Sequence, residues 1–198
     1  LIKISKNQVS LQLNQENALS NNTILSLFKD RDEKIWLGLD NGINCVNINS
    51  NVSIFNDQNG KLGTIYASIN FNGTLYLGTN QGLFHYDNVS KKYELVKGTR
   101  GQVWSLFSHN KTLFCGHHNG TFIIKGKTSE FISNVQGTWM FKAIDENTIF
   151  TGNYEGLNVL KFNQKKWSYD RKIKGFDIST KYFEFIDSTH IIVNHEYK

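Results

Sequence analysis

Apolar and polar residues alternate along the chain in short runs that are separated by glycine and asparagine, a pattern typical of β-strands joined by turns. In one copy of this pattern the runs predict four consecutive strands near 24–29, 34–39, 43–48 and 52–56. The turn Asp40-Asn41-Gly42 joins the second strand to the third. Because asparagine and glycine both accept left-handed torsions, Asn-Gly is a strong hairpin signal. We therefore expect antiparallel strand pairs.

The same pattern returns with a recognisable phrase: a bulky residue, one further residue, a glycine, three residues and a second glycine. Its four copies are Trp36, Gly38 and Gly42; Tyr76, Gly78 and Gly82; Phe114, Gly116 and Gly120; and Phe150, Gly152 and Gly156. The first glycines stand 40, 38 and 36 residues apart. Such a period, with strand-like content, is typical of the four-stranded antiparallel blades of a β-propeller. We expect the bulky residue to pack between neighbouring sheets.

A second set of glycines keeps the same period and precedes apolar, aromatic-rich runs. These leading glycines are Gly63, Gly101, Gly137 and Gly175. In the first copy Asn21-Asn22 takes their place. Since both residue types tolerate a positive φ, both suit a turn into a strand.

The two ends of the chain are in phase with the repeat. Residues 1–5 and 8–13 are expected to be the third and fourth strands of a unit, and 176–186 and 191–195 the first and second. The sequence thus predicts one all-β domain over 1–198 with five repeat units. Its blades are expected at about 22–56, 62–97, 101–133 and 137–169, with a split blade formed by 176–198 and 1–13. The five units would form either a closed five-bladed ring or a slice of a larger propeller.

The first copy, from Ile24 through Asp30 and Trp36-Leu-Gly38 to Gly42, resembles the two-component regulator propeller repeat, and Gly78-Thr-Asn-Gln-Gly82-Leu-Phe-His-Tyr-Asp87 is similar to it as well. That repeat typically has an apolar strand, an Asp-rich turn, Trp-Ile-Gly-Thr, a short turn and Gly-Leu. The resemblance implies a sensor propeller on the periplasmic side of a bacterial hybrid two-component histidine kinase, with oligosaccharides or other extracytoplasmic molecules as ligands. It also implies neighbouring domains of a longer chain as partners, because family sensors usually carry an immunoglobulin-like domain, a membrane span and kinase modules. The sequence leaves open whether the protein forms a homodimer.

Charge and cysteine content narrow the classes of partner. The net charge of +5 is mild, and its densest cluster, 161–174, is expected to be a solvated face. Without a concentrated basic stripe or a known binding module we expect no nucleic acid partner, and without an apolar span no direct membrane contact. The two cysteines, Cys45 and Cys115, lack the spacing of a disulfide framework or a zinc site. We expect both to be free and buried, and we expect no cofactor.

Candidate ligand-binding residues lie at the start of the first strands, which converge on the axis of a propeller. Tyr66, Trp104 and Trp139 stand at the same place after the leading glycine, where Leu25 and Ser179 stand in the first and last copies. Their rings could form a stacking surface for a sugar, with Arg100 pairing an acidic group. The alternative is that the rings only fill space between blades.

Metal sites and catalysis are the rival interpretations. His117 and His118, with His109 nearby, and the acidic turn with Asp30, Asp32 and Glu33 are candidates. We expect exposed turn histidines and ordinary hairpin carboxylates instead, because neither set recurs as a ligand pattern.

An enzyme of the glycosidase type would need two carboxylates facing one site. Only Asp177 and Glu184 lie in a first-strand run, and their odd offset places them on opposite faces of a regular strand. We therefore predict a non-catalytic recognition domain. A scaffold for protein–protein interaction at the cell surface, or a propeller glycosidase or lyase, is the alternative.

Overall fold

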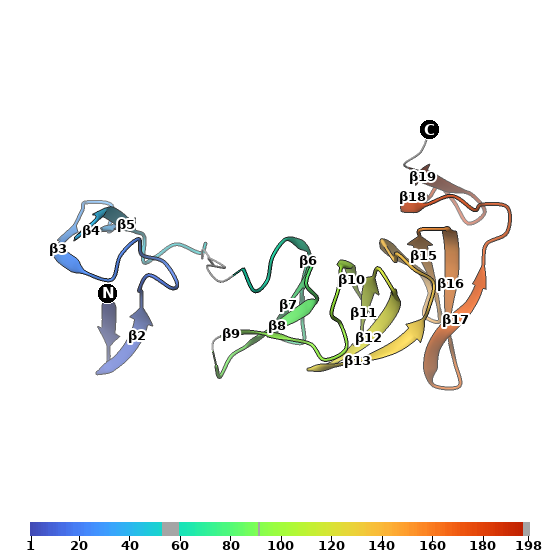
Figure 1. The fold of residues 1–198 in the computed structure, drawn as a ribbon, viewed down its shortest axis with the longest axis horizontal. Coiled ribbons are helices and arrows are strands. Elements are labelled where there is room, and N and C mark those ends of the chain that lie inside the picture. Colours follow the sequence, from blue (N-terminus) through green and yellow to red (C-terminus); the bar gives the residue numbers. More distant parts are fainter. Residues whose placement is uncertain (53–59, 91, 196–198) are drawn as a thin grey trace. The chain divides into compact units, whose positions relative to one another are not determined.

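The computed structural model describes residues 1–52, 60–90 and 92–195. The described residues form strands and turns without a helix, and they fall into two compact units, 1–61 and 62–198. Figure 1 shows both units as ribbons. They contain no helix that is long and apolar enough to cross a lipid bilayer.

The first unit contains two small antiparallel sheets. One pairs β1 (Ile2–Ser5) with β2 (Gln8–Gln12), and the other contains β3 (Ile24–Lys29), β4 (Ile35–Leu39) and β5 (Gly42–Val46). Its core consists of Leu19, Leu37 and Leu39. The fourth strand expected near 52–56 falls almost entirely outside the described residues.

The second unit contains three four-stranded antiparallel sheets and one pair of strands, each with its strands in sequence order. The first sheet is β6 (Ile65–Phe71), β7 (Thr74–Thr79), β8 (Leu83–Asp87) and β9 (Lys92–Leu95). The second is β10 (Val103–His109), β11 (Thr112–His117), β12 (Gly120–Lys125) and β13 (Thr128–Ser133). The third is β14 (Met140–Asp145), β15 (Thr148–Asn153), β16 (Gly156–Asn163) and β17 (Lys166–Lys172). The pair is β18 (Thr180–Phe185) and β19 (Ile191–His195).

The sheets of the second unit stand side by side, as Figure 1 shows from green through yellow to orange. Their first strands are neighbours, since β6 contacts β10, β10 contacts β14 and β14 contacts β18. Meandering four-stranded sheets that succeed one another in this way are propeller blades. The expected all-β propeller architecture is thus confirmed.

The core of the second unit lies between its sheets. Tyr76 of β7 packs with Val103 and Cys115 of the next sheet, and Phe114 packs with Phe141 of the sheet after that. The ring of Phe150 lies 5.7 Å from that of Phe185. The bulky residue of the phrase therefore joins each sheet of this unit to its successor.

In the first unit, Trp36 holds the equivalent place in the phrase. Its side chain is 42% exposed, and its indole N–H donates a hydrogen bond to Asp30 at 2.8 Å. Cys45 stands directly opposite Trp36 on the same face of the sheet and is also exposed, so the expectation that both cysteines are buried is wrong for Cys45. Cys115 is buried, and burial raises the pKa of its thiol.

The two glycines of the phrase serve different purposes. The second glycine has a positive φ in every copy: Gly42 at 99°, Gly82 at 149°, Gly120 at 143° and Gly156 at 114°. The first glycine leaves room for the following blade, because a Cβ on Gly116 or Gly152 would overlap the backbone oxygen of Thr138 or Thr180. A larger side chain at these positions would push neighbouring sheets apart.

The expectation that asparagine takes a left-handed torsion is wrong for the turns of the phrase and for Asn21-Asn22. Asn41 and Asn119 have no positive φ, so these hairpins use an ordinary turn that ends in glycine. Asn21 and Asn22 do not replace the leading glycine by torsion either. Their side-chain oxygens accept hydrogen bonds from the N–H groups of Thr23 and Gln15 at 2.7 Å each. Side-chain hydrogen bonds therefore stabilise this turn.

Candidate functional site

A β-bulge at the start of the first strand fixes where the candidate ligand residues lie. In β10, Val103 pairs with His117 and Ser105 with Gly116, so that Trp104 has no partner across the sheet. Tyr66 occupies the same bulge in β6, between Ile65 and Ala67. A bulge turns its extra side chain away from the regular alternation. Its recurrence presents these two rings in the same way from successive blades.

Lys181 occupies this bulge in β18, where Thr180 pairs with His195 and Tyr182 with Asn194. The expectation that Ser179 would hold the equivalent place is wrong. The bulge is set by pairing with the second strand, whereas the expectation counted residues from the leading glycine. Trp104 follows its glycine by three residues and Lys181 follows Gly175 by six. In the first unit the same bulge contains Leu25, whose side chain is 68% exposed.

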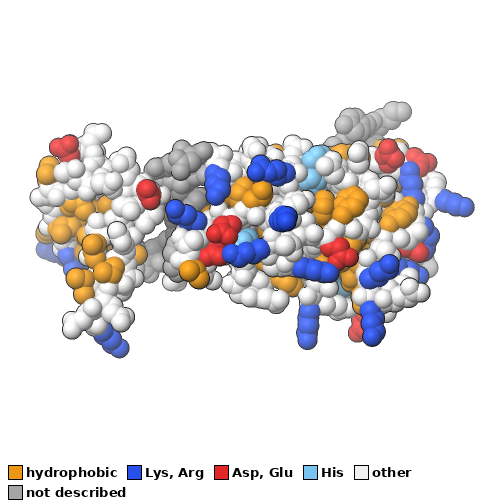
Figure 2. Space-filling view, turned by 60° about the horizontal axis from the view of Figure 1, so that its bottom comes forward, with side chains coloured by type: hydrophobic (Ala, Val, Ile, Leu, Met, Phe, Trp, Pro, Cys, Tyr) orange, Lys and Arg blue, Asp and Glu red, His pale blue; other side chains and the backbone are white. Residues whose placement is uncertain are grey.

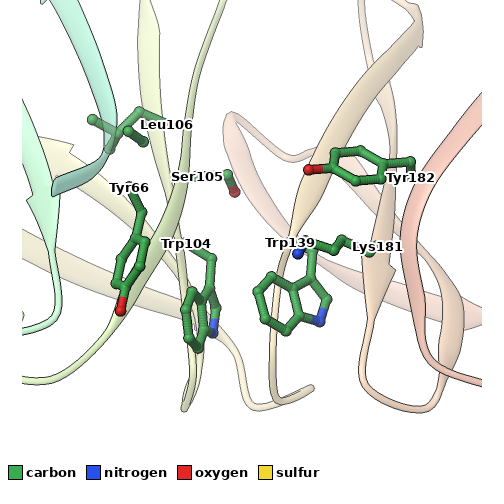
Figure 3. A pocket seen from close by; sticks show the side chains of 8 residues that line it. Tyr66, Trp104, Ser105, Leu106, Trp139, Lys181 and Tyr182 are labelled. Carbon is green, nitrogen blue, oxygen red and sulfur yellow. The ribbon is translucent and has the colours of Figure 1, made fainter. Parts of the chain in front are cut away.

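The aromatic rings from successive blades form a row, which we call the aromatic row: Tyr66, Trp104 and Trp139. The centroids of Tyr66 and Trp104 are 5.0 Å apart, and those of Trp104 and Trp139 are 4.2 Å apart with an interplanar angle of 30°. The ammonium of Lys181 lies 5.1 Å from the ring centroid of Trp139, within the range of a cation–π contact. Figure 3 shows these side chains together, with the two indoles neighbouring each other.

A cavity of about 490 Å³ opens along the aromatic row. It is lined by Tyr66, Ala67, Trp104, Ser105, Leu106, Trp139, Lys181 and Tyr182. Binding sites for small molecules usually measure about 300–1,000 Å³ and combine aromatic walls with a few polar groups. The cavity therefore has the size and lining of a small-molecule site.

Tyr154 supports the aromatic row from the turn between β15 and β16. Its hydroxyl oxygen accepts a hydrogen bond of 3.1 Å from the indole N–H of Trp104, and its ring lies 5.5 Å from that of Trp139. A Cβ on Gly137 would overlap the Tyr154 ring, so this glycine allows their close approach. Tyr154 was missed in the sequence because it falls on a variable position of the repeated phrase. Lys181 could have been found by aligning the last copy on Asn194, which stands where the other copies have the first glycine of the phrase.

A buried polar network fixes the segment that leads to Trp139. Asn153 donates to the hydroxyl of Thr138 at 2.9 Å and accepts from that of Thr151 at 2.7 Å. The hydroxyls of Thr138 and Thr121 lie 2.9 Å apart. All four side chains are buried. These bonds join the second and third sheets next to Trp139. The network thus anchors the backbone immediately before Trp139.

Arg100 is exposed and is not among the residues that line the cavity. The structure brings Tyr66, Trp104 and Trp139 together but does not bring Arg100 to them. Lys181 is the cationic side chain at the cavity.

The histidine pair differs from expectation. His117 is only 1% exposed, so the expectation of two exposed turn histidines is wrong. As the last residue of β11 it lies beneath the turn, where its Nδ1 accepts a hydrogen bond from the Asn119 N–H at 3.1 Å. Burial, together with neighbouring His118, lowers the pKa of His117 to about 4. His118 Nδ1 accepts from the N–H of Gln102 at 3.1 Å.

The carboxylates named in the sequence are engaged within the protein. Asp30 accepts hydrogen bonds from two backbone N–H groups and from Trp36, and the Trp36 bond is the main cause that lowers its pKa. Asp177 pairs with Lys172, and Glu184 pairs with Lys142. Asp177 lies before β18 begins, so the prediction that it and Glu184 point to opposite faces of one strand does not apply. Within 1–52, 60–90 and 92–195, no three His, Cys, Asp or Glu side chains are grouped to hold a metal ion.

Comparison with known families and structures agrees with the propeller fold. Residues 18–41 match the family model of the two component regulator propeller. The matched segment contains the first copy of the phrase as far as Asn41, so the resemblance noted in the sequence is confirmed there. No curated protein matches the chain.

Two solved structures from B. thetaiotaomicron are similar in fold to this propeller. One is described as the extracellular domain of a one component system, with 14% identity and a TM-score of 0.54 over 88% of this chain. The other is described as the extracellular domain of a hybrid two component system, with 15% identity and a TM-score of 0.52 over 93% of this chain. The chain spans only 28% and 29% of their lengths.

Proposed function

We propose that this propeller is a non-catalytic ligand-recognition part of an extracytoplasmic sensor in a bacterial two-component system, and that it binds an oligosaccharide. The family match over residues 18–41 and the fold shared with extracellular domains of one and hybrid two component systems support the class of protein. The aromatic row supports the class of ligand. Neighbouring domains of a longer chain would transmit the signal.

The single observation that carries the proposal is the repeated bulge with its row of rings. Three successive blades present Tyr66, Trp104 and Trp139 to one cavity. The faces of sugar rings carry C–H groups that stack on aromatic side chains, and hydroxyl groups at their edges need hydrogen-bond partners.

Polar groups beside the rings can serve those hydroxyls. Ser105 and Tyr182 line the same cavity. The indole N–H of Trp139 is buried and has no acceptor among the described residues. An unpaired buried donor is costly, so a ligand oxygen that reaches it would gain affinity.

Recognition without bond cleavage is supported by the state of the nearby carboxylates. Hydrolysis of a glycoside requires one carboxyl group as acid and a second as base or nucleophile. The cavity lining contains no Asp or Glu among the described residues, and Asp177 and Glu184 are held in ion pairs. The cavity therefore offers stacking and hydrogen bonding, together with one cation, Lys181.

A calorimetric screen of neutral and acidic oligosaccharides against the 198-residue chain tests the proposal. We expect Trp104→Ala and Trp139→Ala each to weaken binding by about tenfold, since one stacked aromatic contributes about 1 kcal/mol or more. Phe131→Ala is the matched control, because Phe131 is an exposed ring on the outer strand β13, away from the cavity lining.

Three results would contradict the proposal in different ways. If oligosaccharides bind but neither tryptophan variant weakens them, the placement of the site is wrong. If none of them binds, the ligand class is wrong. Release of a reducing sugar from any glycoside by the wild-type chain, but not by the tryptophan variants, would show that the propeller is an enzyme.

A further inference from the structure

The net positive charge of the chain is concentrated in one hairpin. Residues 161–174, which we call the basic hairpin, contain six Lys or Arg and one Asp, whereas the rest of the chain contains sixteen residues of each sign. The whole excess of +5 therefore belongs to fourteen residues at the outer edge of one blade. Figure 2 shows Lys and Arg side chains over the C-terminal part of the second unit, with hydrophobic and a few acidic side chains among them.

The fold presents these charges in an ordered way. The hairpin consists of the outer parts of β16 and β17, and these strands of eight and seven residues are longer than the outer strand pairs of the other two blades. Gln164 and Lys165 form a tight turn with φ of 50° and 64°. Lys161 pairs with Ser168 and Asn163 with Lys166, so that Lys161 and Lys166 lie diagonally on one face. Buried Trp167 anchors the other face in the core between sheets.

Several of these cations have no counter-charge among the residues that the structure describes. Arg171 pairs with Asp170, and Lys172 pairs with Asp177 at 2.5 Å. Lys165, Lys166 and Lys174 are exposed and have no ion-pair partner within the described ranges. The span from Lys166 to Lys172 alone covers about 20 Å of extended strand. A ligand that neutralises this series must carry repeated negative charge over a similar length.

The residue types favour a polymer of acidic sugars. Five of the six cations are lysines, which offer mobile point charges, whereas the bidentate recognition of phosphate favours arginine. Phe162 and Tyr169 are 38% and 39% exposed and lie on the face of Trp167, opposite the face of Lys161 and Lys166. The hairpin therefore offers charge for carboxylate or sulfate groups on one face, and half-exposed rings as apolar surface for sugar rings on the other.

The basic hairpin is separate from the aromatic row. Trp139 lies where β14 begins, beside Gly152, whereas Lys161 pairs with Thr148, which in turn pairs with Asp145 at the other end of β14. Six residues of extended strand separate these ends by about 17 Å. A ligand on the hairpin therefore does not occupy the cavity.

We propose that the basic hairpin binds an acidic polysaccharide along the outer edge of the blade. This would hold an anionic polymer on the propeller independently of the ligand in the cavity. The edge strand β17 has no second hydrogen-bonded strand within the described ranges, so its outer side is open to a linear polymer.

The test is binding of polygalacturonate to the 198-residue chain, measured by affinity electrophoresis and calorimetry at low salt and at physiological salt. Dextran is the neutral polymer for comparison. We expect polygalacturonate to bind and dextran not to bind. We also expect the affinity to fall as salt screens the charges, over a Debye length of about 8 Å at physiological ionic strength.

The variant Lys165→Gln, Lys166→Gln, Lys174→Gln removes three charges from the basic hairpin and should weaken binding of polygalacturonate by about tenfold or more. The matched control is Lys3→Gln, Lys6→Gln, Lys111→Gln, which removes three exposed charges elsewhere and should retain the wild-type affinity. Trp104→Ala should also retain it, which separates this proposal from the one for the cavity. Circular dichroism of both triple variants checks that they fold.

Other outcomes overturn the proposal. Equal loss in the two triple variants would mean attraction to net charge alone. If the wild type does not bind polygalacturonate at low salt, the basic hairpin is not a binding site for acidic polysaccharide. Stronger binding of an oligonucleotide, or of vesicles of anionic lipid, than of polygalacturonate would assign the hairpin to a different class of partner.

Discussion

The side-chain amide of Asn153 donates a hydrogen bond of 2.9 Å to the hydroxyl of Thr138, and both side chains are buried between two blades. The oxygen of the same amide accepts from Thr151 at 2.7 Å and from Asn158 at 3.2 Å. Asn153 thus ties the third sheet to Thr138, whose hydroxyl lies 2.9 Å from that of Thr121 in the second sheet. Since Thr138 immediately precedes Trp139, the relationship links the stability of the propeller to the position of the aromatic row.

Asn153→Ala should lower the free energy of unfolding by about 2–4 kcal/mol, because it removes the buried hydrogen bonds that Thr138, Thr151 and Asn158 make with this amide. Urea unfolding followed by tryptophan fluorescence measures this. Asn147→Ala is the control: its side chain is exposed, and a change within about 0.5 kcal/mol is expected. Equal effects of the two substitutions would show that the network does not stabilise the interface.

Gly116→Ala should destabilise the protein through steric overlap between blades. The new Cβ would overlap the backbone oxygen of Thr138 and the hydroxyl of Ser105, at a cost of about 2 kcal/mol or more. Gly126→Ala separates overlap from backbone strain, because Gly126 has a φ of 61° and open space around it. That control should cost only about 1–2 kcal/mol. A smaller loss for Gly116→Ala than for the control would contradict the explanation, and thermal unfolding of both variants decides it.

His117 should make stability depend on pH between about 4 and 6.5. Its pKa in the folded protein is about 4, below the ordinary value of 6.5, so the unfolded chain takes up a proton first as the pH falls. The contribution of neutral His117 is therefore complete above pH 6.5 and declines toward pH 4, by on the order of 3 kcal/mol.

The measurement is the free energy of unfolding at several pH values for the wild type and for His117→Gln. The variant should lose most of the slope in this range, whereas His109→Gln should retain it. If His117→Gln keeps the wild-type slope, burial of His117 does not cause it. The Asp87 carboxylate does not contribute to this slope, because the hydrogen bond from Lys127 holds its pKa well below the ordinary value.

The two cysteines should differ in reactivity toward a thiol reagent. Cys45 is exposed, whereas Cys115 is buried in the core and burial raises the pKa of its thiol. The native protein should release one equivalent of chromophore rapidly from a disulfide reagent, and the urea-unfolded protein two. Cys45→Ser should abolish the rapid reaction. Rapid labelling that persists in that variant would show that Cys115 is accessible.

The repeat alone was enough to predict the blades, because its glycines and bulky residues meet requirements set by the turn backbone and by the neighbouring blade. The second glycine of the phrase adopts a positive φ in every copy, and the first leaves room for the next blade at Gly78, Gly116 and Gly152. Because these needs return from unit to unit, they leave a period in the sequence. Tyr66, Trp104 and Trp139 could be grouped for the same reason, since they share a place in that period.

Other features could not be predicted from the sequence, because they depend on contacts that differ from one repeat to the next. The register of β18 with β19 places Lys181 in the bulge next to the aromatic row. Because the loop after Gly175 is longer than in the other copies, counting residues from that glycine did not find it. Tyr154 reached Trp104 across fifty residues, and no local pattern marks a long-range hydrogen bond of that kind. The exposure of Cys45 and the burial of His117 were likewise set by which faces the neighbouring sheets cover.

The sequence by itself determined that this protein is an all-β propeller of repeated antiparallel units, because turn torsions and strand alternation are encoded residue by residue. Only the tertiary structure decided which side chains share the cavity, since a bulge and a buried hydrogen-bond network place them there. It also showed that the excess charge lies on one outer hairpin with unpaired lysines. Pairing of charges depends on distance in space, and the order of residues along the chain does not fix that distance.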